Sequence, residues 1–229
     1  MGKSRFLALT PTEVEEAANG LNRDYHSATA EPLTLPIPIE AIAEQYLGYA
    51  IEFTDRGIFE DPRLLGGIDL NSKIIFVNAS VEDHDGRYSF TVAHEVGHHV
   101  LHREAHLDNE SENRKSILCR EVANKPQIEI EADRFAAALL MPSTLVLAAV
   151  KRQRTYRRIR SIGQARGLAS ALISREGFEN VSNTAMVNRL IDLGIVPSSL
   201  GYQDGVTKAR RRYRSASIRF SKLRSVFRI

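Results

Sequence analysis

The stretch SFTVAHEVGHHVLH, residues 89–102, together with His106 just beyond it, holds five of the seven histidines of this 229-residue chain. It contains the pattern H-E-x-x-H, with histidines at positions 94 and 98. On a helix, residues four apart lie one turn apart on the same face, so both imidazoles can reach one metal ion. The apolar residues around the histidines are typical of a partly buried helix, which we expect over residues 87–103.

This pattern predicts a zinc site with hydrolytic chemistry. Zinc binds imidazole nitrogen, and a catalytic zinc needs three protein ligands and a water. His94 and His98 would be two of these ligands. Glu95, the residue after the first ligand, can take a proton from the water, whose pKa the metal lowers to about 7. We therefore expect Glu95 to be the catalytic general base.

The other histidines of the stretch are expected outside the ligand set. His102 and His106 continue the four-residue step, but one ion cannot be reached from four consecutive turns of a helix. Both are therefore expected to be structural or solvated. His99 lies about 100° round the helix from His98, so we expect it to be exposed or to neighbour the site.

A second helix, expected over residues 127–140, offers the third metal ligand. Glu129 and Asp133 are four residues apart and share a face, whereas Glu131 lies about 200° round from Glu129. We therefore expect only one of the two glutamates to point inward. Glu129 is the expected ligand, with Asp133 accepting a hydrogen bond from a ligating histidine. Glu131 is the alternative ligand.

These motifs resemble those of the ImmA/IrrE family of zinc metallopeptidases. The similarity covers residues 35–145 and rests on RYSFTVAHEVGH at 87–98, on the Leu-His pair that follows, and on EIEADRFAAALLMP at 129–142. It implies peptide hydrolysis, zinc as cofactor and a Glu-x-x-x-Asp spacing like that of thermolysin-like enzymes. It also implies a protein substrate, namely a helix-turn-helix transcriptional repressor whose cleavage derepresses genes.

Carried over by position, the resemblance assigns the same roles as the residue patterns. His94, His98 and Glu129 would bind the metal, Glu95 would be the general base, and Asp133 would support a ligating histidine. Residues 181–195 are similar to a helix-turn-helix-like piece that often closes the peptidase region of this family.

The order of the expected elements predicts an α+β fold. A capping-box pattern at residues 12–15 begins a helix that runs to about residue 25. A short helix over 39–47 and a strand over 49–53 follow, and then two strands within 66–78 that are joined by a turn at Asn71-Ser72. They predict a small mixed or antiparallel sheet packed on the helix that carries H-E-x-x-H, and then a helical C-terminal region with a helix-turn-helix-like piece.

Two further expectations concern the edges and loops of this fold. A substrate peptide could add to a free edge of the sheet through backbone hydrogen bonds, and residues 74–78 are the expected edge strand. Residues 106–126 are expected to form a polar loop between the two long helices.

Four regions are expected along the chain. They are an N-terminal helix and connector (1–34), a zinc metallopeptidase domain (35–145), a helical, helix-turn-helix-like region (146–205) and a basic C-terminal tail (206–229).

Basic residues concentrate in a run at 151–160 and in the tail, where nine lysines and arginines and no acidic residue follow Asp204. Such clusters attract phosphate groups and predict weak nucleic-acid contact. The residues expected to make it are Arg154, Arg157, Arg158, Arg211 and Arg212.

An alternative function is a DNA-binding regulator, or a partner-activated toxin-type module, with a peptidase-like fold. Against sequence-specific reading, the expected recognition stretch 184–192 has Arg189 as its only positive charge.

Neither a secretory signal nor a membrane span is expected. The longest apolar run, residues 135–141, is too short to cross a bilayer, and the N-terminus lacks a long apolar segment with a cleavage site. Cys119 is the only cysteine, which excludes an internal disulfide and fits a reducing compartment. We therefore expect a cytoplasmic protein with no membrane partner.

Overall fold

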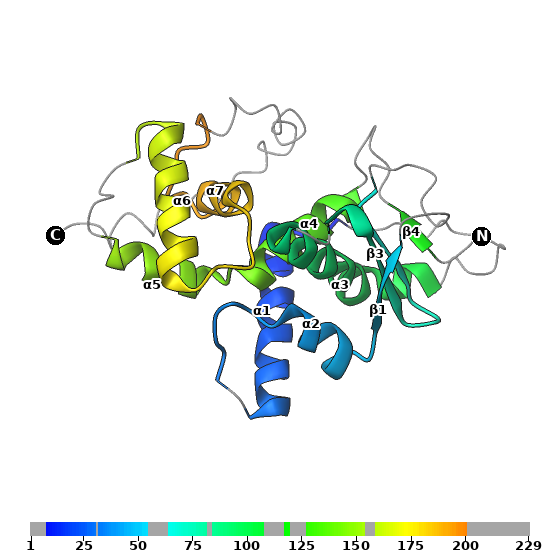
Figure 1. Cartoon of the computed structure of the whole chain (residues 1–229). Helices are drawn as coiled ribbons and strands as arrows, with labels where there is room; N and C mark the ends of the chain where they lie inside the picture. Colours follow the sequence, from blue (N-terminus) through cyan, green and yellow to red (C-terminus); the bar gives the residue numbers. More distant parts are fainter. Residues whose placement is uncertain are drawn as a thin grey trace.

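The computed structural model describes residues 8–30, 32–54, 64–81, 84–107, 117–119, 127–153 and 159–200 (Figure 1). These residues form an α+β fold, as predicted. The helices are α1 (Pro11–Thr29), α2 (Ile39–Ala41, continued by a π-helical turn, Ile42–Tyr46), α3 (Asp85–Leu107), α4 (Gln127–Leu140), α5 (Ser143–Arg152), α6 (Ile162–Glu176) and α7 (Asn183–Asp192). The strands are β1 (Ala50–Thr54), β2 (Gly66–Asp69), β3 (Ile74–Asn78) and β4 (Ile117–Cys119), and a 3-10 turn, Ala79–Val81, follows β3.

The N-terminal helix begins earlier than the capping-box pattern at residues 12–15 predicted. Thr10 is the N-cap: its hydroxyl accepts a hydrogen bond from the backbone N–H of Glu13 at 3.3 Å. The Glu13 carboxylate accepts one from the backbone N–H of Thr10 at 2.7 Å. The predicted cap was wrong because Pro11 can occupy the first helical position, where a backbone N–H has no partner within the helix.

The described strands form a mixed sheet in the order β1-β3-β2-β4. β3 pairs in parallel with β1 and antiparallel with β2, and β2 also pairs antiparallel with β4. The predicted turn between β2 and β3 is confirmed, and there the side chain of Asp69 accepts hydrogen bonds from the backbone N–H groups of Asn71 and Ser72 at 2.9 and 3.1 Å.

Two predictions about the sheet were wrong. β3, expected at the edge, lies between β1 and β2. Its centre, Ile75 to Val77, is buried, which is the environment that a continuous apolar run favours. The segment expected to be only a polar loop contains β4, and three residues are too few to show a strand periodicity. The edge strands of the described sheet are therefore β1 and β4.

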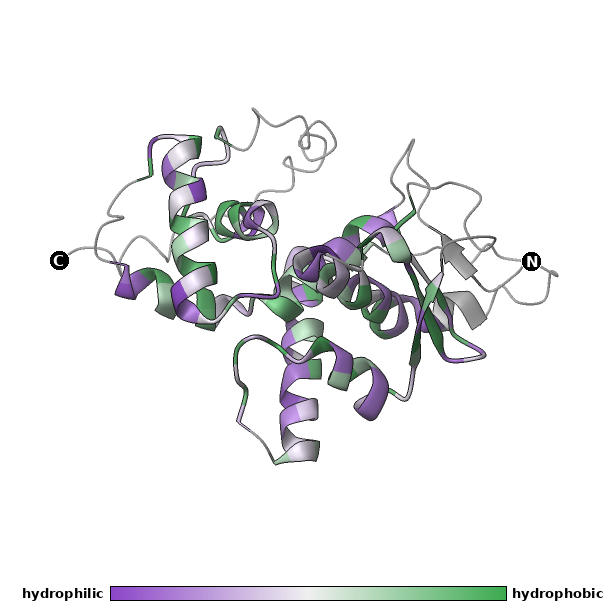
Figure 2. Ribbon diagram, in the orientation of Figure 1, coloured by the Kyte–Doolittle hydropathy of each residue, from purple (hydrophilic) through white to green (hydrophobic). Residues whose placement is uncertain are grey.

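The two long helices meet between the sheet and α1. α3 contacts β2 and β3, α4 packs against α3, and α1 contacts α4 (Figure 1). β3 is hydrophobic along most of its length, whereas hydrophobic and hydrophilic residues both lie along α1 (Figure 2). Phe135 and Leu139 of α4 are fully buried in the shared core. The helices that carry the expected metal ligands thus lie in the protein interior.

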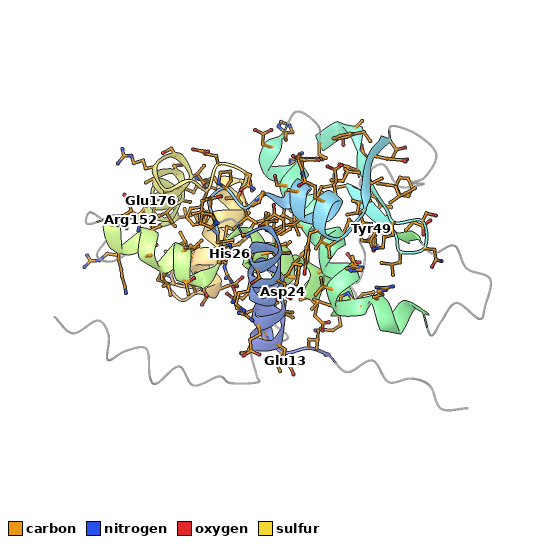
Figure 3. All side chains as sticks on the ribbon, turned by 90° about the horizontal axis from the view of Figure 1, so that it is seen from below. Glu13, Asp24, His26, Tyr49, Arg152 and Glu176 are labelled. Atoms are coloured by element: carbon orange, nitrogen blue, oxygen red, sulfur yellow. The ribbon has the colours of Figure 1, made fainter. Side chains whose placement is uncertain are left out.

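The helices after Pro142 gather on the side of the molecule away from the sheet (Figure 1). Arg152 at the end of α5 donates from Nε to Glu176 at the end of α6 at 2.7 Å, and the two residues lie together in Figure 3. α6 and α7 pack against each other. The helical character predicted for this region is confirmed.

Arg189 of α7 ties this region to the rest of the core. Its Nε donates to the carbonyl oxygen of Met141 at 2.9 Å, and its two Nη atoms donate to the Glu15 carboxylate at 2.8 and 2.6 Å. The residue is 4% exposed. The single positive charge of the expected DNA-recognition stretch is therefore used inside the protein.

A membrane span needs a long apolar helix, and none in the described ranges qualifies by itself. α4 and α5 meet the length and composition requirements only as a pair, across a bend of 52°.

Glu15→Gln is expected to lower the free energy of unfolding by about 1.5–3 kcal/mol, because a neutral amide replaces the carboxylate that holds the buried Arg189. Burial alone would raise the pKa of Glu15, but hydrogen bonds and charge from Arg189 and hydrogen bonds from Ser143 outweigh it and lower the pKa. A carboxyl group of this kind stabilises the fold above its unfolded-state pKa, and the effect is lost as the pH falls through the lower folded-state value. Urea unfolding should show a difference from wild type at neutral pH that shrinks in acid.

Glu16→Gln is the matched control, because Glu16 is exposed on the same helix. It should leave the free energy of unfolding almost unchanged. Equal losses in the two variants, or a Glu15→Gln loss that persists in acid, would contradict the role given to the ion pair.

Candidate metal centre

Two histidines of α3 and one glutamate of α4 converge at a buried point. His94 Nε2 lies 3.1 Å from His98 Nε2 and 3.3 Å from Glu129 Oε2. His98 Nε2 lies 3.1 Å from Glu129 Oε1. All three side chains are buried, and together they form a group able to hold a metal ion. The structure thus brings together the three residues that the sequence predicted as ligands.

The spacing and chemistry of these atoms suit zinc. A tetrahedral zinc ion with bonds of about 2.0–2.1 Å separates its ligand atoms by about 3.3 Å. The separations between the two imidazole nitrogens and the carboxylate are 3.1–3.3 Å. Two imidazoles and one carboxylate are also the protein ligands of one common kind of catalytic zinc site, which keeps a fourth position open. The residues present therefore fit the metal.

Gly97, between the two histidines, lets the helices approach closely enough to form this group. A Cβ atom added at Gly97 would lie 3.1 Å from a ring carbon of Phe135 and 3.2 Å from the Cα of Ala132. Both neighbours belong to α4, and one of the contacts is with its backbone. Because side chains at the crossing would push the helices apart, the glycine sets the distance between the histidines and Glu129.

The electrostatic surroundings favour a cation at His94. Burial alone would lower the pKa of His94, but hydrogen bonds to Asp133 and Glu129 and the charge of Glu95 raise it to about 9. Burial would raise the pKa of Glu129, but hydrogen bonds and charges from His94 and His98 lower it well below its ordinary range. Burial is the main cause that lowers the pKa of His98 to about 4. At His94 the carboxylates therefore raise the pKa more than burial lowers it, as expected where a site binds positive charge.

Glu95 is buried beside the ligands, on the turn of α3 that carries His94. The start of β2 runs against it: a Cβ atom added at Gly66 would lie 2.9 Å from Glu95 Oε1 and 2.4 Å from the Cγ2 of Thr91. Sequence reasoning did not identify Gly66 as part of the site. The signal that could have found it is the glycine pair at the start of a strand, because glycine in a strand often marks a close approach of other groups.

Asp133 lies where the sequence predicted a partner for a ligating histidine. Its Oδ1 lies 3.0 Å from His94 Nδ1. An N–H at His94 Nδ1 therefore donates to the Asp133 carboxylate, which leaves Nε2 as the ring nitrogen that can bind a metal ion beside Glu129.

The prediction that only one glutamate of α4 points inward was wrong. Glu129 is 4% exposed and Glu131 is 0% exposed. Both are buried because α4 packs between α3 and α1, so it has no single inner face. Glu131 does not join the ligand group; its Oε2 lies 3.1 Å from His102 Nε2. His102 is fully buried, in agreement with a structural rather than a ligating role.

Other residues of the histidine-rich helix, and the arginines expected to contact nucleic acid, lie as follows. His99 is half-buried, and its Nδ1 lies 2.8 Å from the hydroxyl of Tyr49, which is labelled in Figure 3. Tyr88 stacks on Phe53, with the ring centroids 5.5 Å apart. The imidazole of His106 lies outside the described side chains, and Arg154, Arg157, Arg158, Arg211 and Arg212 lie outside the described residues. Nucleic-acid contact through these arginines stays a prediction.

A helix with an H-E-x-x-H motif, crossed by a second helix that brings a glutamate to its histidines, defines a zinc-metallopeptidase-like protein. Residues 45–175 match the peptidase family described as the IrrE N-terminal-like domain. This match covers more than half of the chain, and the chain belongs to that family. The resemblance found in the sequence is therefore confirmed. A comparison with curated proteins finds no matching relative.

Gly97→Ala is expected to lower the free energy of unfolding by about 1 kcal/mol or more, because overpacking at the crossing outweighs the higher helix propensity of alanine. Gly20→Ala is the matched control, because the nearest atom to a Cβ there is a guanidinium nitrogen of Arg23 at 3.8 Å. It should raise the free energy of unfolding by about 0.5–1 kcal/mol. Thermal or urea unfolding of both variants gives the comparison, and equal signs would contradict a tight crossing.

Proposed function

We propose that this protein is a zinc-dependent endopeptidase that hydrolyses a peptide bond in a helix-turn-helix transcriptional repressor and thereby derepresses genes. The observation that carries the proposal is that His94 Nε2 and His98 Nε2 lie 3.1 Å apart and each lies 3.1–3.3 Å from an oxygen of Glu129, with Glu95 next to them. Membership of the peptidase family supports the hydrolytic activity. The repressor substrate rests on the behaviour of ImmA/IrrE-like proteins, and it places the reaction in the cytoplasm.

The chain supplies the groups that such a hydrolysis needs. When bound at His94, His98 and Glu129, zinc supplies Lewis acidity toward water and a carbonyl group. Glu95 accepts a proton from the attacking water and then donates it to the nitrogen of the leaving amine. Asp133 holds the His94 ring in the orientation that directs Nε2 at the site. Gly66 keeps the space beside Glu95 clear of a side chain.

The alternative of a sequence-specific DNA-binding regulator is not favoured by the packing of α7. A reader of base edges needs free donors on its recognition helix. Arg189, the one cation of that stretch, is held by Glu15 and by the carbonyl of Met141. We therefore assign α7 a packing role and keep the peptidase proposal.

Glu95→Gln should abolish cleavage and keep the bound metal, because the amide cannot accept the proton of water while the three ligands stay in place. The assay incubates the zinc-loaded chain with a helix-turn-helix repressor encoded beside its gene and identifies fragments by mass spectrometry. Metal analysis of the same samples reports occupancy. An intact repressor with the wild-type protein would count against this substrate, and full activity of Glu95→Gln would remove Glu95 from its role.

Glu129→Ala should lose most of the bound zinc, because two imidazoles remain where a catalytic site needs three protein ligands. The matched control is Glu176→Ala, which removes a carboxylate at the end of α6, where it is bonded to Arg152 and not to the metal group. Inductively coupled plasma analysis after dialysis measures the zinc content of both variants. Retention of zinc by Glu129→Ala at the wild-type level would contradict the ligand assignment.

A further inference from the structure

A buried chain of polar groups leads away from the ligand His98 and takes no part in the chemistry described so far. His98 Nδ1 lies 3.2 Å from His102 Nδ1, and His102 Nε2 lies 3.1 Å from Glu131 Oε2. The other oxygen of Glu131 accepts hydrogen bonds from the backbone N–H of Leu9 at 2.9 Å and from Gln127 Nε2 at 2.6 Å. His102 and Glu131 are both 0% exposed.

The Glu131 carboxylate determines which nitrogen of each imidazole ring carries a hydrogen. An ionised carboxylate only accepts hydrogen bonds, so the nitrogen that faces Glu131 Oε2 carries a hydrogen, which makes His102 an Nε2–H tautomer. His102 Nδ1 then has a lone pair and accepts from His98 Nδ1–H. With Nδ1 donating, His98 can offer a metal ion the lone pair of Nε2, the atom that lies 3.1 Å from Glu129 Oε1.

We propose that Glu131 and His102 are positioning residues that hold His98 in its metal-binding tautomer and ring orientation. The inference rests on the proposed metal site, because His98 must be a ligand for its tautomer to matter. The Glu131–His102 chain does for His98 what Asp133 does directly for His94. Leu9, which precedes α1, and Gln127 fix the carboxylate that begins the chain.

Full burial of the pair argues for this use. Burying a carboxylate and an imidazole is costly unless their hydrogen bonds are satisfied, and an apolar pair could fill the same space. Here each bond also constrains the next one, and the chain ends on a ligand nitrogen. A purely structural pair would not need to contact His98.

Glu131→Gln tests the donor and acceptor order of these hydrogen bonds, because glutamine has nearly the same shape as glutamate. The side-chain oxygen of glutamine is required by the donors of Leu9 and Gln127, so its NH2 group would face His102 Nε2. That arrangement forces a hydrogen onto His102 Nδ1, which then needs an acceptor at His98 Nδ1. His98 would carry its hydrogen on Nε2, the atom required for the metal.

The expected result is a zinc affinity 10- to 100-fold lower in Glu131→Gln than in the wild-type full-length chain, as is typical when a partner of a ligating histidine is lost. Competition with a chromophoric chelator measures the affinity. Nitrogen-15 NMR of the zinc-loaded protein reports the tautomer of His102, expected as Nε2–H in the wild type and Nδ1–H in the variant. Glu16→Gln, which alters an exposed carboxylate outside these hydrogen bonds, should keep both the affinity and the tautomer.

A second pair of variants decides the question if Glu131→Gln does not fold. His102→Asn places an oxygen near the position of His102 Nδ1 and can still accept from His98, whereas His102→Leu cannot. The asparagine variant should bind zinc more tightly than the leucine variant, and equal affinities in the two would overturn the proposal.

Three other outcomes would also overturn it. Equal zinc affinity in wild type and Glu131→Gln would show that Glu131 and His102 do not position His98, while leaving the metal site intact. A lower affinity with an unchanged His102 tautomer would assign the loss to the missing charge and not to positioning. A wild-type chain that binds no zinc would overturn the metal site and this proposal together.

Discussion

The close crossing of α3 and α4 is the contact on which the site depends. Gly97 has no side chain where the backbone of Ala132 and the ring of Phe135 approach it. Protein interiors pack tightly and tolerate little added volume, so this contact sets one separation between the two helices. At that separation, His94 and His98 lie within 3.3 Å of the Glu129 carboxylate. A metal site of this kind is therefore a property of the helix interface.

Helix α4 contributes more to the site than a single ligand. It carries the ligand Glu129 and also Asp133, which bonds to His94. It also carries Glu131, whose hydrogen bond to His102 leads on to His98. Packing on both sides of α4 makes this possible, because α3 and α1 bury opposite sides of the helix. The backbone of Leu9 completes the arrangement. The N-terminal segment thus supports the metal ligands as well as the core.

The C-terminal helices support the same interface from its far end. Arg189 of α7 donates hydrogen bonds to the carbonyl oxygen of Met141, the residue after α4, and to the carboxylate of Glu15 in α1. An arginine with its donors satisfied in this way holds three helices in one arrangement. Residues 181–195, which resemble a helix-turn-helix piece, contain the single helix α7, and the surrounding contacts explain the basic residue within it.

The sequence alone determined most of the elements and most of the site. Local patterns were sufficient for α4, for β2, β3 and their turn, and for the ligands His94 and His98, because helical and strand periodicities are properties of neighbouring residues. Only the tertiary structure decided that β3 is interior, that Glu131 is buried together with Glu129, and that Gly66 borders Glu95. These facts depend on which elements pack against each other, and no periodicity within one segment specifies its neighbours.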